Sequence, residues 1–278
     1  HWTRVTERLP TKVESIKPHP HGIELGQLQR MVAESKDLNL NHFLLNNFSG
    51  VTNRARKELC QAAELEGTRK MKTIKGDDVR ALLEAFQGER HFNALPVKLL
   101  KPPTNCLSPI EEMLIKKGLS KTIDSRFATT LTRVPSVTQG NPFQVEVGLI
   151  FGGTMASDKP VEILRFANRV PLMYQQGGCL LTKAIESVDW RQYGLEQAGG
   201  KGVPKGPAAI LVHLASTNVQ FTSEAKEALA DNAEVMEEAR KAMLEMGRGL
   251  RKHLEKKKKM AKTKEKFELI NDILPAIC

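Results

Sequence analysis

Residues 141–153 read NPFQVEVGLIFGG and decide the fold of the second half of this 278-residue chain. Polar and apolar side chains alternate at first, and the stretch then becomes fully apolar, as in a strand at the centre of a sheet. Residues 206–217, GPAAILVHLAST, form a second apolar run. Its proline stands at the start, where a strand tolerates the missing N–H. The two runs predict two central strands.

The segments around these strands differ in character. Propensity alone does not assign residues 161–174, VEILRFANRVPLMY, whereas residues 177–190, GGCLLTKAIESVDW, predict a helix opened by glycines. From Ser223 onward the chain is helix-forming for about 45 residues, which corresponds to a helix of roughly 70 Å. Its apolar stripe runs to Leu254, and the following residues 255–266, EKKKKMAKTKEK, are expected to leave the core.

The first half is helical in pattern from residue 23 to about residue 87. Residues 49–60, SGVTNRARKELC, predict a helix start with Thr52 or Asn53 as the N-cap. Residues 76–87, GDDVRALLEAFQ, predict another helix, whose acidic first turn suits the helix dipole. These patterns predict a compact all-helical domain.

Prolines dominate the two remaining segments. Residues 88–141 predict a connector wrapped on the next domain, with one short helix around residues 109–117, and residues 1–22 predict an irregular linker. His19 and His21 could in principle ligate a metal. Because no third ligand lies nearby, a stiff linker is the favoured interpretation and no metal is expected.

Composition limits the classes of function. The net charge of +10 and the pI near 9.4 favour a polyanionic partner, while 5% aromatic residues argue against a single-strand binder that stacks bases. No apolar run is long enough to predict a membrane span, and no secretory signal is visible, so a cytoplasmic, nucleoid-associated location is expected. The absence of a CxxC pair predicts free thiols in a reducing compartment. The cysteines are Cys60, Cys106, Cys179 and Cys278.

Long strings of this sequence resemble one family. Residues 141–153, 161–190 and 221–231 stand in the order and at the spacing of the transducer domain of the DNA topoisomerase VI B-subunit family. Residues 17–26, KPHPHGIELG, and 106–119, CLSPIEEMLIKKGL, are also similar to the family. The resemblance covers nearly the whole chain.

The resemblance implies an α+β fold in four parts. It implies a linker over 1–22, a helix–two-turn–helix domain over 23–90, a transducer over 91–222 and a long stalk helix over 223–278. The transducer is expected to be an α/β two-layer sandwich, ribosomal-protein-like, with a left-handed crossover. Physical rules alone favour a right-handed crossover, so this expectation rests on the resemblance.

The resemblance also implies a role in an archaeal-type, ATP-dependent type IIB DNA topoisomerase, which relaxes supercoils by double-strand passage. Such an enzyme is an A2B2 heterotetramer, in which the stalk meets the DNA-cleaving A subunit and ATP brings two B subunits together on double-stranded DNA. ATP and Mg2+ would be bound mainly by an N-terminal domain that this chain, starting at His1, is expected to lack. No DxGxG or glycine-rich lid is visible, so this segment alone is not expected to hydrolyse ATP. The alternative is a non-enzymatic nucleic-acid-binding scaffold or an ATPase-deficient meiotic B-like partner.

Lys226 is the strongest candidate functional residue. It follows the second strand run at the expected mouth of the long helix, where a lysine can place a point charge on a phosphate. Spacing alone favours an ordinary solvated lysine. By resemblance, Lys226 is the switch lysine that reaches the γ-phosphate of ATP, although Ala225 stands where relatives often have glycine.

A second set of candidates concerns DNA. Trp190, Arg191 and Tyr193 resemble a WKxY element at which related subunits meet DNA, while packing of the aromatic rings in a core is the alternative. Lys201 and Lys205 follow in a glycine-rich loop without the Walker pattern, so a flexible basic loop is the alternative there.

A third set lies at the turn before the helix that begins near residue 53. Free N–H groups and two arginines could clamp phosphate there, without reading bases, and a plain helix start is the alternative. These candidates are Ser49, Gly50, Asn53, Arg54 and Arg56. The lysines at 256–259 are expected to be solvated unless DNA reaches them. Phe166, Asn168 and Arg169 are interpreted as architectural, fixing the sheet against the following helix.

Overall fold

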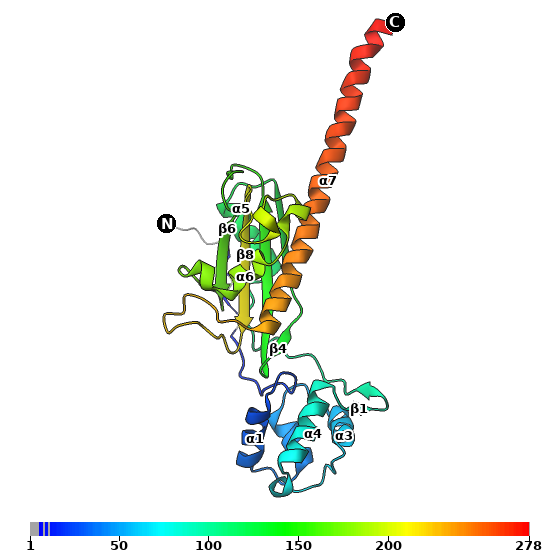
Figure 1. Ribbon diagram of the computed structural model, residues 1–278, viewed down its shortest axis with the longest axis vertical. Helices are drawn as coiled ribbons and strands as arrows, with labels where there is room; N and C mark the ends of the chain where they lie inside the picture. The colour runs from blue at the N-terminus through cyan, green and yellow to red at the C-terminus, as the bar shows by residue number, and fades with distance from the viewer. Residues whose placement is uncertain (1–5, 8, 11, 278) are drawn as a thin grey trace.

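The computed structural model describes residues 6–7, 9–10 and 12–277. A helical domain, a sheet-based domain and one long helix follow each other along the molecule (Figure 1). None of the helices in the described part is both long and apolar enough to cross a membrane. Cys60, Cys106 and Cys179 are free, buried thiols, as expected, and Cys278 lies outside the described residues.

Four α-helices and one short 3-10 helix form the helical domain: α1 Leu25–Glu34, α2 Leu40–Asn47, α3 Asn53–Ala62, Met71–Thr73 and α4 Gly76–Gln87. The Thr52 hydroxyl accepts a hydrogen bond from Ala55 N–H, which confirms Thr52 as the N-cap of α3. The domain has its own apolar core, which includes the fully buried Leu28, Phe43, Leu59 and Leu82.

The sheet-based domain contains six strands: β3 Phe127–Thr132, β4 Ser136–Thr138, β5 Asn141–Phe151, β6 Glu162–Ala167, β7 Val170–Pro171 and β8 Ala208–Ser216. The strand order is β3-β5-β8-β6-β7, with β4 also paired to β5. The two strands predicted to be central, β5 and β8, are antiparallel neighbours inside the sheet. The segment that propensity leaves unassigned folds as β6 and β7, and β6 runs parallel to β8.

The connector contains more regular structure than expected. A small hairpin, β1 His91–Phe92 and β2 Leu95–Pro96, is followed by α5, Glu112–Thr122, which begins and ends later than the expected helix. One short helix was expected in this segment, but it also supplies two strands of the main sheet, since β3 and β4 pair with β5. The threonine-rich β3 is half-buried along its whole length, so it lacks the alternation that marks a strand in sequence.

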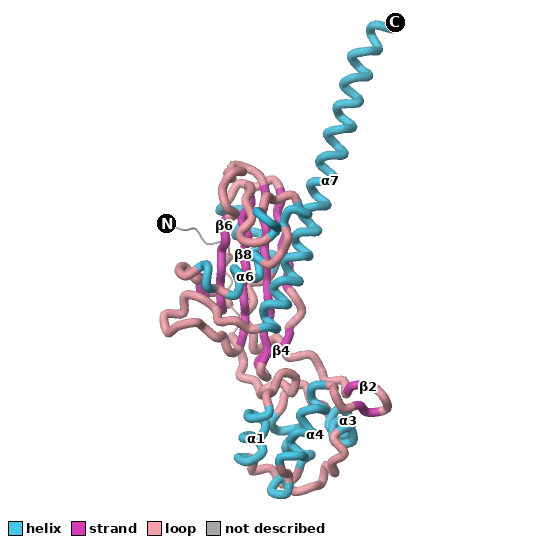
Figure 2. Tube along the Cα trace, viewed as in Figure 1, coloured by secondary structure: helices cyan, strands magenta, loops and turns pink. Residues whose placement is uncertain are grey.

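Helices cover both faces of the sheet (Figure 2). The helix predicted after the glycines, α6 Leu180–Glu186, packs with the long helix α7, Ala233–Ile277, against one face. The other face carries α5, whose Ile115 and Leu119 pack on Ile150 of β5. α5 therefore adds a partial third layer to the expected two-layer sandwich.

The long helix begins ten residues later than expected, at Ala233 rather than Ser223. Its first turn is capped by the Asn232 side chain, which accepts from Val235 N–H. Ala228 and Leu229 are buried in the sheet-domain core, so the chain before residue 233 folds as a loop instead of continuing the helix. The helix is packed on the sheet-based domain as far as Leu254, with His253 stacked on Phe127, and then extends into solvent (Figure 1).

Candidate switch loop and nucleic-acid contacts

Lys226 lies at the tip of a closed loop formed by residues 220–230. Ala230 N–H donates to Gln220 O (3.0 Å) and Thr222 N–H donates to Ala228 O (3.0 Å), which close the base of the loop. Lys226 is exposed and has a positive φ of 55°. Because α7 begins seven residues later, its N-terminal dipole does not act at this side chain, and that part of the prediction was wrong.

The base of this loop is fixed to α6. Leu180 N–H donates to Leu229 O (3.1 Å), and Leu229 N–H donates to the buried thiol of Cys179 (3.5 Å). Lys183 of α6 binds both carboxylate oxygens of Asp231 at 2.8 Å. Since α6 packs on α7, the tip of the loop is exposed while its base is joined to the long helix.

Two of the three candidates in the WRQY element are core residues. The Trp190 side chain is fully buried, and its indole N–H donates to Ile185 O (2.8 Å). Tyr193 is also buried, and its ring lies against Gly247 of α7. The packing alternative therefore holds for both rings, and neither is available to stack on a base.

Arg191 is the exposed member of this element. Its guanidinium forms an ion pair with Asp189 (2.7 Å) and lies next to Gly200, so the glycine-rich loop of Lys201 folds against it. Lys201 and Lys205 are both exposed. The structure thus brings Arg191 and the loop that carries these lysines to one surface.

At the turn before α3, the backbone is already engaged. Ser49 N–H donates to Pro18 O (2.9 Å), and Gly50 O accepts from Leu100 N–H (3.1 Å). A side chain on Gly50 would meet the His19 ring. The prediction of a free N–H group at Ser49 was therefore wrong, because the linker occupies it, whereas at Gly50 the connector engages the carbonyl and the N–H stays a predicted phosphate donor.

The neighbouring polar candidates divide by exposure. Asn53, the first residue of α3, is exposed, and Arg54 is 88% exposed while paired with Glu58 at 2.7 Å. Arg56 is half-buried, and its Nε lacks a hydrogen-bond partner among the described residues. Asn53 and Arg54 are accordingly the residues of this set that a ligand can reach.

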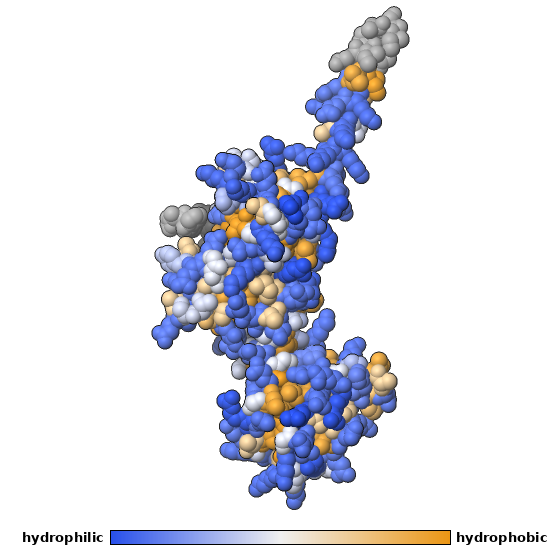
Figure 3. Space-filling view, in the orientation of Figure 1, coloured by the Kyte–Doolittle hydropathy of each residue, from blue (hydrophilic) through white to orange (hydrophobic). Residues whose placement is uncertain are grey.

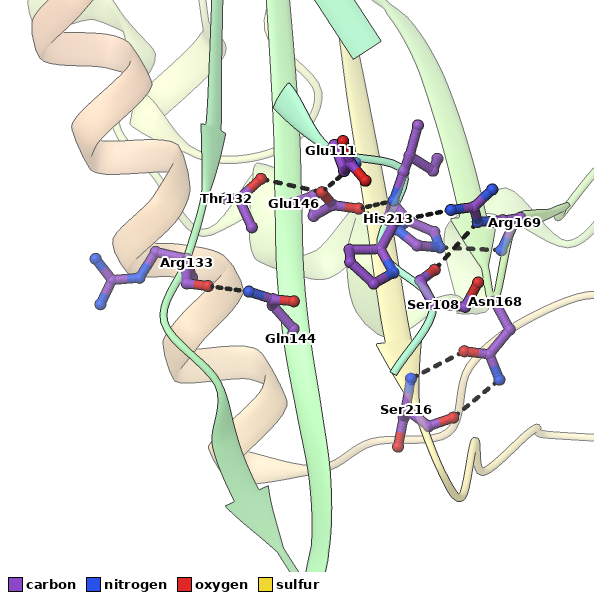
Figure 4. Close-up of polar contacts among 12 residues, drawn as sticks. Ser108, Glu111, Thr132, Arg133, Gln144, Glu146, Asn168, Arg169, His213 and Ser216 are labelled. Carbon is purple, nitrogen blue, oxygen red and sulfur yellow. Dashed lines mark hydrogen bonds and ion pairs between the residues drawn. The ribbon is translucent and has the colours of Figure 1, made fainter. Parts of the chain in front are cut away.

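The sequence patterns did not reveal a buried polar network between β5 and β8 (Figure 4). Glu146 and His213 stand opposite each other in the register, both fully buried, and their side chains are 2.7 Å apart. The Glu146 carboxylate also accepts from the N–H groups of Ile110 and Glu111. Burial acts to raise the pKa of Glu146, but the bond from His213 and these N–H groups hold the pKa below its usual value.

The same network holds the β6–β7 turn. Arg169 N–H donates to His213 Nε2 (2.9 Å), and its guanidinium reaches the carbonyl groups of Ser108 and Pro109. Asn168 exchanges two hydrogen bonds with the Ser216 backbone, each 2.9 Å long. Asn168 and Arg169 are architectural, as interpreted, but Arg169 fixes the sheet against the connector and Asn168 joins the β6–β7 turn to the end of β8, so neither acts on the following helix (Figure 4). A glutamate and a histidine inside two apolar runs were the available sequence signal.

Fold and site together define a class of protein. It is a mixed α+β chain in which a helical domain precedes a sheet that packs on the base of a long protruding helix. The topoisomerase VI B subunit transducer family matches residues 102–266. The chain belongs to this family.

Similar proteins extend over the rest of the chain. The B subunit of type 2 DNA topoisomerase 6 from Methanococcoides burtonii is 46% identical over 274 residues, which cover 99% of this chain and 43% of that protein. The corresponding B subunits of Archaeoglobus fulgidus and Saccharolobus islandicus are 45% and 30% identical, with 44% and 50% of their lengths covered. The chain therefore spans half or less of the length of these relatives.

Among solved structures, the ATPase domain of Thermus thermophilus gyrase B in complex with an aminocoumarin is 19% identical to this chain. The alignment covers 57% of this chain and 45% of that one, with a TM-score of 0.31.

Proposed function

We propose that this chain is the nucleotide-sensing and motion-transmitting part of a B subunit of an ATP-dependent type IIB DNA topoisomerase, with Lys226 as its switch lysine. The observation that carries the proposal is the position of Lys226, exposed at the tip of a loop whose base is joined to α6. In the described part of the chain, no carboxylate lies within ion-pair distance of its ammonium group. Lys226 is thus available to an external anion.

In this proposal, a domain outside this chain binds ATP and Mg2+, and Lys226 places its charge on the γ-phosphate. A fixed positive charge stabilises negative charge that develops on the transferred phosphoryl group. When hydrolysis releases the lysine, the loop moves, and the contacts of Leu229 with Cys179 and Leu180 carry the displacement to α6. Because α6 packs on α7, the long helix rotates with it.

The free part of α7 is the proposed contact with the DNA-cleaving A subunit. Beyond the sheet it carries exposed apolar side chains at Met260, Phe267 and Ile270, seven and three residues apart and so on one side of the helix. Exposed apolar residues gather toward the end of an otherwise hydrophilic helix (Figure 3). Such a stripe on a protruding helix is typical of a protein-binding surface. The full assembly would be an A2B2 heterotetramer whose B subunits meet when ATP binds.

Double-stranded DNA is the proposed polyanionic partner. Arg191, Lys201, Lys205 and Arg54 are exposed cations on the sheet-based and helical domains, and the chain carries a net charge of +10. In this proposal these cations bind phosphates, so binding would be insensitive to sequence and would weaken with salt.

The proposed domain limits keep those expected from the sequence, except that the stalk begins at Ala233. We place the linker at 1–22, the helix–two-turn–helix domain at 23–90, the transducer at 91–232 and the stalk from Ala233. The transducer would have the left-handed β6–α6–β8 connection that the family resemblance implies. The Lys226 loop thus belongs to the transducer and not to the stalk.

Chemical labelling of lysines tests the proposed contact. The full-length protein would be acetylated briefly with and without a non-hydrolysable ATP analogue, and the modification of each lysine measured by mass spectrometry. The expected result is a nucleotide-dependent loss of reactivity at Lys226, with no change at Lys98 and Lys241 as controls. Equal reactivity of Lys226 in both samples would contradict a contact with the nucleotide.

A further inference from the structure

The turn between β4 and β5 contacts three parts of the molecule through three consecutive residues. Thr138 ends β4, and Gln139 and Gly140 form the turn, with φ values of 48° and 74°. Two consecutive positive φ values make a tight hairpin turn whose geometry matches the twist of the strands. A turn of this kind holds its side chains in fixed positions relative to the sheet.

Thr138 is bound to the start of the long helix. Its hydroxyl accepts from Asn232 Nδ2 (2.8 Å) and donates to Glu234 Oε2 (3.1 Å). Asn232 is the residue that caps α7. The first turn of α7 is therefore held to the β4–β5 turn.

Gly140 is bound to the linker that leads into the helical domain. His19 N–H donates to Gly140 O (2.8 Å), and the buried His19 ring donates in turn to Leu100 O (2.8 Å). A Cβ atom on Gly22 would lie 2.9 Å from Gln139 N, so the two backbones are in direct contact. This contact leaves little freedom between the turn and residues 18–23.

Gln139 joins the helical domain to the Lys226 loop with a single amide group. Gln220 Nε2 donates to Gln139 Oε1 (2.6 Å), and Gln139 Nε2 donates to Glu24 Oε1 (3.4 Å). A carboxylate accepts hydrogen bonds, so Glu24 orients the Gln139 amide with its NH2 group toward the carboxylate. The Gln139 oxygen then faces Gln220, which must supply an N–H donor. Glu24 is the N-cap residue of α1, and Gln220 opens the loop that carries Lys226.

We infer that Gln139 is a positioning residue for the Lys226 loop, and that the helical domain sets the position of this loop through the Glu24–Gln139–Gln220 chain of hydrogen bonds. The inference rests on the proposed function of Lys226. A ligand that moves the helical domain would then change the nucleotide affinity. By thermodynamic reciprocity, nucleotide would change the affinity for that ligand, DNA, by the same factor.

The test measures this factor in the full-length B subunit with its A subunit. DNA affinity is determined with and without a non-hydrolysable ATP analogue for wild type, Gln139→Ala, Gln220→Ala and the double variant. Couplings between sites are typically about 5- to 150-fold. The coupling ratio is the DNA affinity with the analogue divided by the affinity without it. Each single variant is expected to reduce this ratio at least about threefold. The double variant should reduce it no further than either single variant does, because all three remove the same hydrogen bond. The matched control is Gln29→Ala, an exposed glutamine of α1, which should keep the wild-type ratio.

The DNA affinity without nucleotide and the thermal midpoint distinguish a positioning role of Gln139 from a merely structural one. A positioning residue leaves the DNA affinity without nucleotide and the thermal midpoint unchanged. If both fall, Gln139 only supports the fold and the inference is overturned. Gln220 is exposed, so Gln220→Ala carries the test even where Gln139→Ala folds poorly.

Failure of the inference and failure of the proposed function look different. A wild-type ratio in Gln139→Ala and Gln220→Ala, together with a ratio of one in Lys226→Ala, would overturn the inference alone. A wild-type ratio in Lys226→Ala would remove the proposed function and this inference with it.

Discussion

The ring of Tyr193 lies directly against Gly247 of the long helix, so that the helix backbone and the WRQY element touch without an intervening side chain. Leu254 makes a similar close approach to Gly194, the residue that follows this element. Tyr193 is thereby a packing residue that holds the 3-10 helix Trp190–Tyr193 to α7. A displacement of α7 must therefore move this element too.

Two glycines of α7 test this contact. Replacement of a helical glycine by alanine normally stabilises by up to about 1 kcal/mol. We expect this gain for Gly249→Ala, because a Cβ atom there meets only ordinary contacts with Thr129. Gly247→Ala should instead lower the free energy of unfolding by about 1–3 kcal/mol, since the new methyl group overlaps the Tyr193 ring. Urea unfolding of both variants is the measurement, and equal stabilisation would contradict the contact.

The Glu146 network should be a main source of stability in the sheet-based domain. Glu146→Ala removes the acceptor of His213 and of two backbone N–H groups at once, in a fully buried position. Each buried donor left without its acceptor costs about 1–3 kcal/mol, and more where the acceptor was charged. Chemical denaturation should show a loss of this size, whereas the exposed Glu237→Ala should stay close to wild type. A loss below ~1 kcal/mol would show that the network does not hold the connector.

His19 should give the junction of the two domains a dependence on pH. Burial lowers the pKa of His19, although the bond to Leu100 O opposes the shift. The folded state therefore binds fewer protons than the unfolded one. Neutral His19 contributes its whole stabilisation above its unfolded pKa of about 6.5. This stabilisation is lost as the pH falls through that value toward the folded pKa.

Hydrogen exchange of the Ser49 and Leu100 amides, which bond across the junction, follows this loss between about pH 7.5 and 5.5. We expect extra opening at the lower pH in the wild type, after correction for intrinsic exchange, and a smaller pH effect in His19→Gln. The contribution of Glu146 is not lost in this range, because its pKa lies below the usual carboxyl value. Identical pH effects in both proteins would assign the change to another group.

Arg191 and Asp189 offer a matched pair for the DNA contact. Arg191→Ala should weaken DNA binding of the full-length protein and reduce the slope of log affinity against log salt by about one. Asp189→Ala removes the competing carboxylate and leaves the cation, so it should strengthen binding. If both variants weaken binding equally, the ion pair only supports local structure.

The sequence predicted those elements whose pattern is repeated over many residues. The alternation and apolar run of β5, the apolar run of β8 and the stripe of α7 all have their counterparts in the structure. The half-buried, threonine-rich β3 was missed because only its pairing with β5 makes it a strand. The start of α7 was misplaced because the burial of Leu229 in the distant core overrides local helix propensity.

The candidate site was predictable in its residue types and not in its contacts. Lys226 was identified by resemblance. Its separation from the start of α7 could not be predicted, because it depends on the loop that the hydrogen bond between Gln220 and Ala230 closes. Trp190 and Tyr193 could be either core or ligand-binding residues, and only their burial decides. Gln139 carries no sequence signal, because its partners lie 115 and 81 residues away.

The proposed switch role depends most directly on the charge of Lys226. The decisive measurement is ATP hydrolysis and supercoil relaxation by the full-length protein with its A subunit, in wild type, Lys226→Ala and Lys226→Arg. The exposed Lys98→Ala serves as the control for loss of one surface lysine. Removing one preorganised donor from developing negative charge typically costs about 10²–10³-fold, so Lys226→Ala should lose both activities, while Lys98→Ala keeps wild-type hydrolysis. Undiminished hydrolysis and relaxation by Lys226→Ala would contradict the switch role and leave Lys226 an ordinary surface charge.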